Sequence, residues 1–319
     1  MIYIELSGRC GNQLYEYAFA RAMMEKTGDQ TLIVNDFMVR KNARMKPNER
    51  GFVNELAYFH TIPWIPDSKN GRMIFQHTNL IQKIIMLPFV ILFYLLAARY
   101  TQLYNKIQCF FQPVMNRMGI YWMYGVNKLS FYKHKKRLIF GTCESPIHFD
   151  HIRHNLLEEL TPIADVMESN KQLFNRIQQE ESVCISVRRG DYFIQDAMST
   201  LAICNERYFR EAVSIIHKEI PYVTFFLFSD DVEWCKTHVT FGTEINITYV
   251  NQNMPVYETL RLMYNCKHFI ISNSSFSWWG QYLSRNDQKI VIAPSRWDKR
   301  YAHHHMIDPS WTLIDVNKL

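Results

Sequence analysis

Two adjacent arginines are the residues of this sequence best suited to holding a phosphate. The apolar run 183–187 is followed by Arg188 and Arg189, and then by Gly190 and Asp191. Neighbouring residues on a strand point to opposite faces, so one arginine should face a ligand while the other packs inward. A guanidinium at the end of a strand, beside a glycine that allows close approach to the backbone, suits a phosphate group. The alternative interpretation is a structural ion pair between an arginine and an aspartate.

A serine-rich turn is the second place where an anion could bind. The apolar run 269–272 leads into Asn273, Ser274 and Ser275, and a helical pattern begins at Phe276. The first N–H groups of a helix have no partner inside the helix and carry partial positive charge. Together with the serine hydroxyls, they predict a site for phosphate oxygens.

A glycine loop near the start of the sequence is the third candidate. The expected strand 2–6 is followed by Gly8 and Gly11, then by Asn12 and Gln13, before a helical pattern. The N–H groups of such a loop lie near the positive end of the helix. The spacing is not the Gly-x-Gly-x-x-Gly fingerprint of dinucleotide binding, which disfavours a Rossmann oxidoreductase.

The sequence contains no recognisable metal-binding motif. Asp230 and Asp231 are adjacent rather than spaced as Asp-x-Asp, the pattern that would hold a divalent ion on a nucleotide diphosphate. We interpret them as supplying the cap of the next helix, beside Trp234. The histidines at 303–305 are consecutive and rarely converge on one ion, so we read them as a surface loop. The seven cysteines, an odd number without a Cys-x-x-Cys pair, indicate a reducing compartment.

The segments that must position these residues alternate between strand and helix. This alternation predicts a parallel sheet covered on both faces, with ligands binding beyond the carboxyl ends of the strands. In the first part of the chain we expect a helix at 14–26 that ends at Gly28, then a strand at 31–34, and mostly helix in the basic, apolar stretch 68–143. In the second part we expect strands at 183–187, 224–228, 247–250, 269–272 and 290–293, and helices at 206–218, 257–266 and 276–283.

Composition and charge narrow the class of protein. With 319 residues, 48% hydrophobic and 21% charged, the chain is globular and long enough for one large α/β unit or two domains. The net charge of +6 is unevenly spread, because 68–143 contains eleven lysines and arginines and no Asp or Glu. The remainder is net acidic, which argues against a nucleic-acid-binding protein.

An apolar run within this basic segment has two interpretations. Residues 84–98 form fifteen uncharged positions between Lys83 and Arg99 and include Pro88. The run is shorter than the roughly 20 residues that span a bilayer as a helix. It therefore predicts either a buried core helix or an interfacial membrane element. Because no basic and apolar leader opens the sequence, we expect a cytoplasmic protein, with peripheral contact with anionic membrane on the inner face as the second interpretation.

Four motifs occur in the order seen in the α-1,2-fucosyltransferase family (glycosyltransferase family eleven), which this sequence resembles. The resemblance covers both ends of the chain and most of 180–285, and it fades between about 35 and 140. The motifs are Gly8-x-x-Gly11-Asn12-Gln13-Leu14-x-x-Tyr17-Ala18, Val187-Arg188-Arg189-Gly190-Asp191-Tyr192, Phe228-Ser229-Asp230-Asp231-x-x-Trp234, and Leu262-Met263-x-x-Cys266-Lys267-His268 running to Ser274-Ser275-Phe276-Ser277-Trp278-Trp279-Gly280.

The resemblance implies a fold and a reaction. The fold would be α/β and GT-B-like, with two Rossmann-type domains facing a cleft. Residues 1–165 would form an acceptor-side domain with a basic, apolar helical insert at 68–143, residues 166–300 the nucleotide-sugar-binding Rossmann domain, and 301–319 a tail. The reaction would be inverting transfer of L-fucose from GDP-fucose to the 2-hydroxyl of a galactoside, in surface polysaccharide or O-antigen synthesis. It would need no metal and no cofactor, and its acceptor would be a glycan or a lipid-linked oligosaccharide.

The resemblance also implies roles for individual residues. Arg188 would stabilise the charge on the departing diphosphate, and Arg189 would be structural within the donor site. Asp191 and Asp196 are two candidates for the general base, and neither is preferred. The remaining donor-binding residues would be Ser186, Glu258, Ser274, Ser275 and Phe276, and the cleft loop would be Gly11, Asn12 and Gln13.

Two positions depart from the pattern of the family. Ser186 stands where the family usually has histidine, and Thr259, after Glu258, stands where it usually has aspartate. Both positions lie near the donor in relatives. One alternative is therefore a transferase of the same fold that uses another nucleotide sugar. The other is a sugar-nucleotide-binding subunit without turnover.

Overall fold

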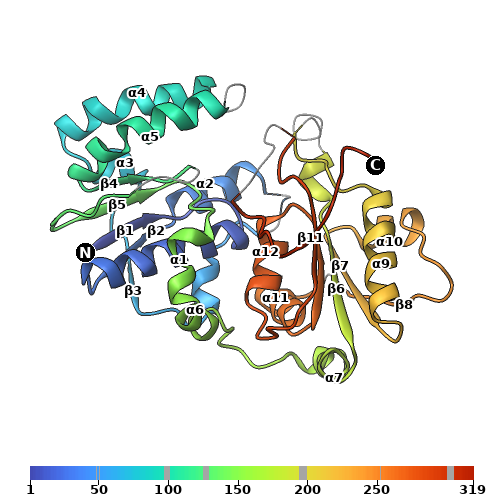
Figure 1. The fold of residues 1–319 in the computed structure, drawn as a ribbon. Helices are drawn as coiled ribbons and strands as arrows, with labels where there is room; N and C mark the ends of the chain where they lie inside the picture. The colour runs from blue at the N-terminus through green and yellow to red at the C-terminus, as the bar shows by residue number, and fades with distance from the viewer. Residues whose placement is uncertain are drawn as a thin grey trace. The chain divides into compact units, whose positions relative to one another are not determined.

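The computed structural model describes residues 1–47, 49, 51–96, 101–124, 129–193, 200–251, 253–299 and 305–319. The chain forms two compact units (Figure 1). The N-terminal unit contains residues 1–57 and 61–159, and the C-terminal unit contains residues 58–60 and 160–319. The short segment 58–60 belongs to the C-terminal unit because Phe59 forms an antiparallel bridge with Pro162.

The N-terminal unit is built on a five-stranded sheet with the order β3-β2-β1-β5-β4. All of its strand pairs are parallel. The strands are β1 (Ile2–Glu5), β2 (Leu32–Asn35), β3 (Trp64–Pro66), β4 (Ile120–Trp122) and β5 (Arg137–Phe140). The helices are α1 (Cys10–Thr27), α2 (Phe37–Met45), α3 (Met73–Gln76), α4 (Leu80–Leu96), α5 (Thr101–Arg117) and α6 (Arg153–Glu159).

The predicted first strand, helix and second strand are confirmed. Helix α1 ends at Gly28, as the sequence predicts, with a left-handed backbone (φ of 70°) and an N–H that donates to the carbonyl of Met24 at 2.8 Å. A residue with a Cβ would be strained in that conformation.

The stretch 68–143, expected to be mostly helical, also contains the strands β4 and β5, and the strand β3 precedes it. The sequence pattern predicts none of these three strands. These strands have only three or four residues. Every residue of β4 and β5 is buried, so neither shows the alternation of apolar and polar residues that marks a half-exposed strand.

The C-terminal unit is built on a six-stranded parallel sheet with the order β11-β10-β9-β6-β7-β8. The predicted α/β fold with two parallel sheets is confirmed, and each predicted strand and helix of this unit lies within two residues of its observed bounds. The strands are β6 (Ser182–Val187), β7 (Thr224–Ser229), β8 (Asn246–Tyr249), β9 (His268–Ile271), β10 (Val291–Pro294) and β11 (Thr312–Ile314). The helices are α7 (Lys171–Gln179), α9 (Glu206–Glu219), α10 (Val232–His238), α11 (Val256–Tyr264) and α12 (Ser275–Tyr282).

The register of the central strands brings three of the four motifs, those that follow β6, β7 and β9, to one edge of the sheet. Val187 at the end of β6 pairs with Ser229 at the end of β7, and Ser186 pairs with Ile271 at the end of β9. The loops that follow these strands therefore begin at the same level. Strand β11 lies in the segment expected to be a tail, and it extends the sheet beside β10.

Candidate functional site

Asp230 holds both arginines of the loop after β6. Its Oδ2 lies 2.8 Å from Nη1 of Arg188, and its Oδ1 accepts a hydrogen bond of 2.8 Å from the backbone N–H of Arg189. The Arg–Asp pair that the sequence leaves open as an alternative is thus present. This contact uses one of the five N–H donors of the guanidinium. Both side chains of the pair remain partly exposed.

Arg189 packs against aromatic rings. Its guanidinium carbon lies 3.6 Å from the ring centroid of Phe193 and 3.6 Å from that of Trp234. These are cation–π contacts, and they orient Arg189 away from the position of Arg188 on the strand. The predicted cap of the next helix is confirmed, since the carboxylate of Asp231 accepts a hydrogen bond of 3.0 Å from the N–H of Trp234.

Gly190 is needed for the contact between Arg188 and Asp230. A Cβ at position 190 would overlap Oδ2 of Asp230, the oxygen that binds Arg188, and would lie 3.9 Å from the guanidinium carbon. Any side chain at this position therefore displaces one member of the pair.

Three serine hydroxyls form a buried chain beneath this edge. Ser186 shares a hydrogen bond of 2.7 Å with Ser277, which shares one of 3.0 Å with Ser272. All three side chains are buried. The hydroxyl of Ser186, at the position where the family usually has histidine, is thus engaged inside the C-terminal unit.

The loop after β9 presents the start of α12. Ser274 is the residue before the helix, and its side chain makes no capping hydrogen bond. Ser275 and Phe276 form the first turn. The loop is fixed through Asn273, whose carbonyl accepts a 3.0 Å hydrogen bond from the hydroxyl of Tyr192, a residue of the loop after β6. Its amide donates at 2.9 Å to the carbonyls of Leu201 and Trp297.

Glu258 is placed differently from the other predicted donor-binding residues. It is fully buried, and its carboxylate pairs with Arg261 at 2.8 Å. It also accepts hydrogen bonds from the N–H of Met167 at 3.0 Å and from the amide of Asn170 at 3.2 Å. These bonds fasten the segment 167–170 to α11, so the visible role of Glu258 is structural.

The structure does not select a general base. Asp191 belongs to the 3-10 turn Gly190–Phe193, whereas Asp196 lies outside the described residues. Of the histidines at 303–305, only His305 is described. Within the described residues, no three His, Cys, Asp or Glu side chains are grouped so that they could hold a metal ion.

In the N-terminal unit, residues at the start of α1 hold the glycine loop in place. Gly8 has a left-handed backbone (φ of 66°), and a Cβ there would lie 2.8 Å from the side chain of Asn12. Gln13 is fully buried, donates to the carbonyl of Val53 at 2.8 Å, and accepts from the N–H of Glu55 at 2.9 Å. Gln13 therefore holds the loop in shape, whereas ligand contact by Gly11 and Asn12 stays a prediction.

Buried carboxyl groups near this loop have no motif in the sequence that would reveal them. Glu16 accepts hydrogen bonds from the N–H of Ser7 at 2.9 Å and from its hydroxyl at 2.5 Å, and burial still raises the pKa of Glu16 well above its usual value. Burial also raises the pKa of Glu55 to about 7 and that of Glu144, which follows β5, to about 7. A glutamate within the first helix, such as Glu16, is a weak signal of a buried carboxyl group, because most glutamates are exposed.

We expect Glu55→Gln to stabilise the protein at pH 8 and to change little at pH 4. Burial raises the pKa of Glu55 in the folded state to about 7, against an ordinary value of 4.5, so the wild-type protein loses stability as the pH rises from 4.5 to 7. A neutral amide removes that loss, which is about 3 kcal/mol at 1.36 kcal/mol per pKa unit. Urea unfolding at both pH values measures the difference. Glu168→Gln, on the surface, is the matched control, and an equal effect at both pH values would contradict the assignment.

Comparison with known proteins assigns the class of protein to which this fold and candidate site belong. The chain is a glycosyltransferase. The family model for glycosyl transferase family 11 matches residues 1–315, so the chain belongs to that family, and the resemblance drawn from the four motifs is confirmed.

Individual relatives show where the similarity lies. The α-1,2-colitosyltransferase of Escherichia coli is 34% identical over 181 residues, which are 55% of this chain and 61% of that protein. The O-antigen biosynthesis glycosyltransferase WbnK of Escherichia coli is 24% identical over 301 residues, which are 93% of this chain and 94% of WbnK. Among solved structures, the fucosyltransferase NodZ from Bradyrhizobium aligns with a TM-score of 0.48 and 14% identity, over 89% of this chain and 92% of NodZ.

Proposed function

We propose that this glycosyltransferase transfers L-fucose from GDP-fucose to the 2-hydroxyl of a galactoside, with inversion, during synthesis of a surface polysaccharide or O-antigen. The observation that carries the proposal is the Arg188–Asp230 pair at the carboxyl edge of β6 and β7. Membership of family 11 supports glycosyl transfer, and the name of WbnK, which spans nearly the whole chain, supports the pathway class.

The proposed reaction breaks one bond and forms another at the anomeric carbon. The acceptor oxygen attacks this carbon while the bond to the β-phosphate oxygen breaks, and the acceptor proton passes to a base, for which Asp191 and Asp196 remain candidates. Negative charge grows on the departing GDP, and a fixed cation that faces it lowers the barrier. Arg188 supplies that cation, and Asp230 holds its planar head in one orientation.

The start of α12 completes the proposed diphosphate site. Ser274 makes no capping bond, so its hydroxyl and the first N–H groups of α12 can meet phosphate oxygens. Ser186 supports the diphosphate site indirectly, because its hydrogen bond to Ser277 connects the end of β6 to the first turn of this helix. Arg189 supports the loop through its aromatic contacts, and Glu258 supports α11.

A second candidate donor is favoured by a specific observation. The relative that is 34% identical is named as a colitosyltransferase, and colitose is fucose without its 3-hydroxyl. The serine at position 186 and the threonine at position 259 are the two departures from the family pattern near the donor. A nucleotide-linked colitose is therefore the alternative donor to test first.

A donor-by-acceptor screen tests the proposal. GDP-fucose, GDP-colitose, and UDP- and dTDP-sugars are each incubated with β-galactosides, with and without EDTA, and the product mass is measured. We expect fucosylated product with GDP-fucose and equal rates in EDTA. A faster reaction with GDP-colitose would select the second candidate, and abolition by EDTA with recovery in Mg²⁺ would show that the donor site is wrong. GDP binding without product from any donor would indicate a non-catalytic subunit.

A further inference from the structure

Helix α4 is apolar on both its inner and its outer face. On the inner face, Met86 and Phe89 are buried against the strands β4 and β5. On the outer face a second apolar stripe is exposed, and Leu80 at its start is 73% exposed. A helix that is apolar all round is normally surrounded by protein or lipid. The exposed stripe has helical spacing and consists of Leu80, Ile81, Ile84, Leu87, Ile91 and Leu95.

Helix α5 is partly inverted. Its polar residues Gln108, Gln112 and Asn116 are fully buried, and Gln108 donates a hydrogen bond of 2.6 Å to the carbonyl of Trp122. Several of its apolar residues point outward, with Phe110 78% exposed and Val114 also exposed, whereas Met115 is buried in the core. An amphipathic helix that packs on a sheet in water normally has the opposite arrangement. This inversion indicates that the outer face meets an apolar partner.

The two outer faces form one surface, which we call the hairpin face. Helices α4 and α5 lie side by side (Figure 1), and the rings of Phe89 and Phe111 lie 4.9 Å apart. The amide of Gln82 donates to the carbonyl of Met118 at 2.9 Å, which places the start of α4 at the end of α5. Ordinary proteins expose scattered apolar residues, whereas a continuous apolar surface formed by two helices marks an interaction site.

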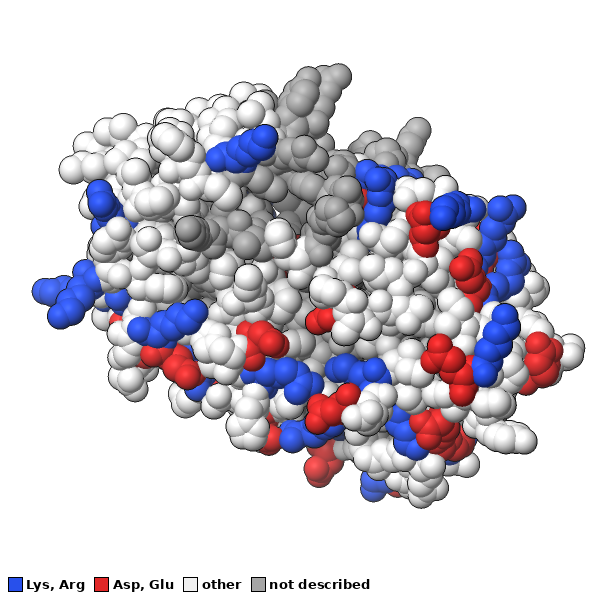
Figure 2. Space-filling view, viewed as in Figure 1, with Lys and Arg blue, Asp and Glu red and all other residues white. Residues whose placement is uncertain are grey.

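A basic rim borders the hairpin face. Residues 68–143 contain no Asp or Glu, and the surface over α4 and α5 in Figure 2 shows blue among white without red. The loop at 131–135 is fixed to the end of α5, since the ring of His134 lies 3.2 Å from the carbonyl of Asn116 and Arg117 lies over the ring of Tyr132. Lys133 and Lys135 are exposed on this loop.

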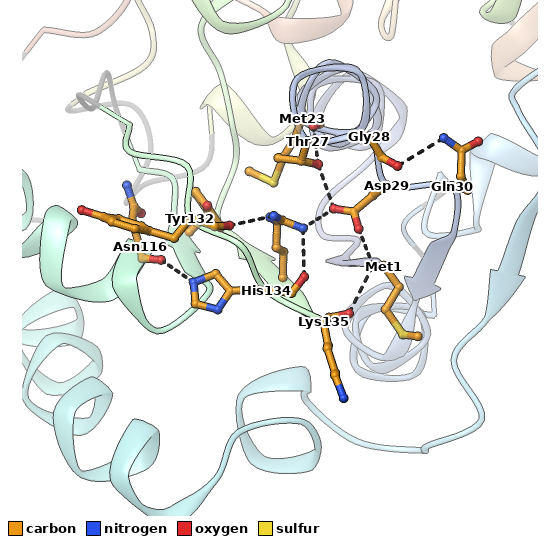
Figure 3. Close-up of polar contacts among 12 residues, drawn as sticks. Met1, Met23, Thr27, Gly28, Asp29, Gln30, Asn116, Tyr132, His134 and Lys135 are labelled. Atoms are coloured by element: carbon orange, nitrogen blue, oxygen red, sulfur yellow. Dashed lines mark hydrogen bonds and ion pairs between the residues drawn. The ribbon is translucent and has the colours of Figure 1, made fainter.

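A small pocket of about 290 Å³ opens on the same loop (Figure 3). Asp29, the acid in it, is already bound by the guanidinium of Arg137 and the hydroxyl of Thr27. The N-terminal ammonium group of Met1 also pairs with Asp29, and Figure 3 shows the side chain of Lys135 pointing away from this cluster. Its lining residues are Thr27, Asp29, Lys133, His134, Lys135 and Arg137.

We propose that the hairpin face inserts into the interfacial layer of an anionic bilayer, with the basic rim contacting lipid phosphates. No helix among the described residues has the length and hydrophobicity needed to cross a membrane, so the contact lies in the plane of the interface. Charge decides between a bilayer and a second copy of the chain. Two copies would bring two basic rims together and repel, whereas anionic headgroups attract each base.

Some residues of the stretch 68–143 are not available to a bilayer. Tyr121 and Trp122 belong to β4 and are buried in the core, so they do not supply interfacial aromatics. Lys136 donates to the carbonyl of His77 at 3.0 Å, and Arg137 is buried. Among the described residues of this stretch, Lys106, Lys133 and Lys135 are exposed and can contact a headgroup.

Vesicle co-sedimentation tests the proposal, with phosphatidylcholine alone compared with phosphatidylcholine–phosphatidylglycerol mixtures at low and high salt. We expect binding to the anionic vesicles that weakens with salt. Loss of three rim lysines should lower the partition coefficient roughly 10²-fold, about fivefold for each base. Loss of three apolar side chains should lower it by roughly tenfold or more for each. The rim variant is Lys106→Gln with Lys133→Gln and Lys135→Gln, and the face variant is Ile81→Ser with Ile84→Ser and Phe110→Ser.

Matched controls come from exposed residues of the C-terminal unit. Tyr222→Ser, and Lys171→Gln with Lys318→Gln, should leave binding unchanged. Circular dichroism checks that each variant is folded. If the triple face variant is not folded, Phe110→Ser alone is tested in its place. Equal indifference to neutral and anionic vesicles at low salt would overturn the proposal. So would self-association that the face variant abolishes without any lipid binding, because the face would then meet a second copy.

Discussion

Arg188→Lys should lower kcat by roughly 10²–10³, the usual cost of losing one group that stabilises charge in the transition state. Lysine keeps the positive charge but loses the planar head that binds Asp230 and that, in the proposed mechanism, also binds phosphate oxygens. The measurement is GDP release at saturating donor and acceptor, with GDP affinity from calorimetry as a second readout. Arg210→Lys, on the exposed side of α9, is the matched control and should match wild type. A folded Arg188→Ala protein with near-wild-type turnover would remove Arg188 from the mechanism.

Gly190→Ala should lower kcat by about 10²-fold although it removes no functional group. The added Cβ overlaps Oδ2 of Asp230, so the carboxylate must move and the guanidinium of Arg188 moves with it. Displacing a catalytic group by about 1 Å costs on this order. Steady-state kinetics measure the loss.

A second glycine provides the control for this experiment. Gly242→Ala also directs a Cβ at a carboxylate, that of Glu244, but this carboxylate does not belong to the Arg188–Asp230 pair. Its activity should equal that of wild type. If Gly190→Ala were equally active, the orientation of Arg188 by Asp230 would have no catalytic value.

The C-terminal unit could be predicted closely because its local and global signals agree. Its strands β6 to β10 have four to six residues, and they alternate with helices such as α9, whose cap is the side chain of Asn205. The site predicted from this region lies at the expected edge, because parallel strands place their carboxyl ends together. What the sequence left open was the pairing of Arg188, since whether an arginine meets Asp191 or Asp230 depends on the strand order.

The N-terminal unit was harder to predict for two physical reasons. Strands as short as β4 carry too few residues to show a period, and their burial comes from long-range packing. Helix α5 buries Gln108 and Gln112 and exposes Phe110. Its pattern therefore contradicts the rule that the apolar face of a helix packs against the core. The raised pKa of Glu55 likewise depends on burial by residues distant in sequence.

The hydrogen-bonded serines limit what the interior beneath the candidate site can hold. Ser186 and Ser277 are 91 positions apart, yet they share a buried hydrogen bond, so a larger side chain at either position would press on the other. Such a change would also break the chain of hydrogen bonds that joins the ends of β6 and β9 to α12. A substitution in the interior would therefore be felt at the surface edge where the ligand is proposed to bind.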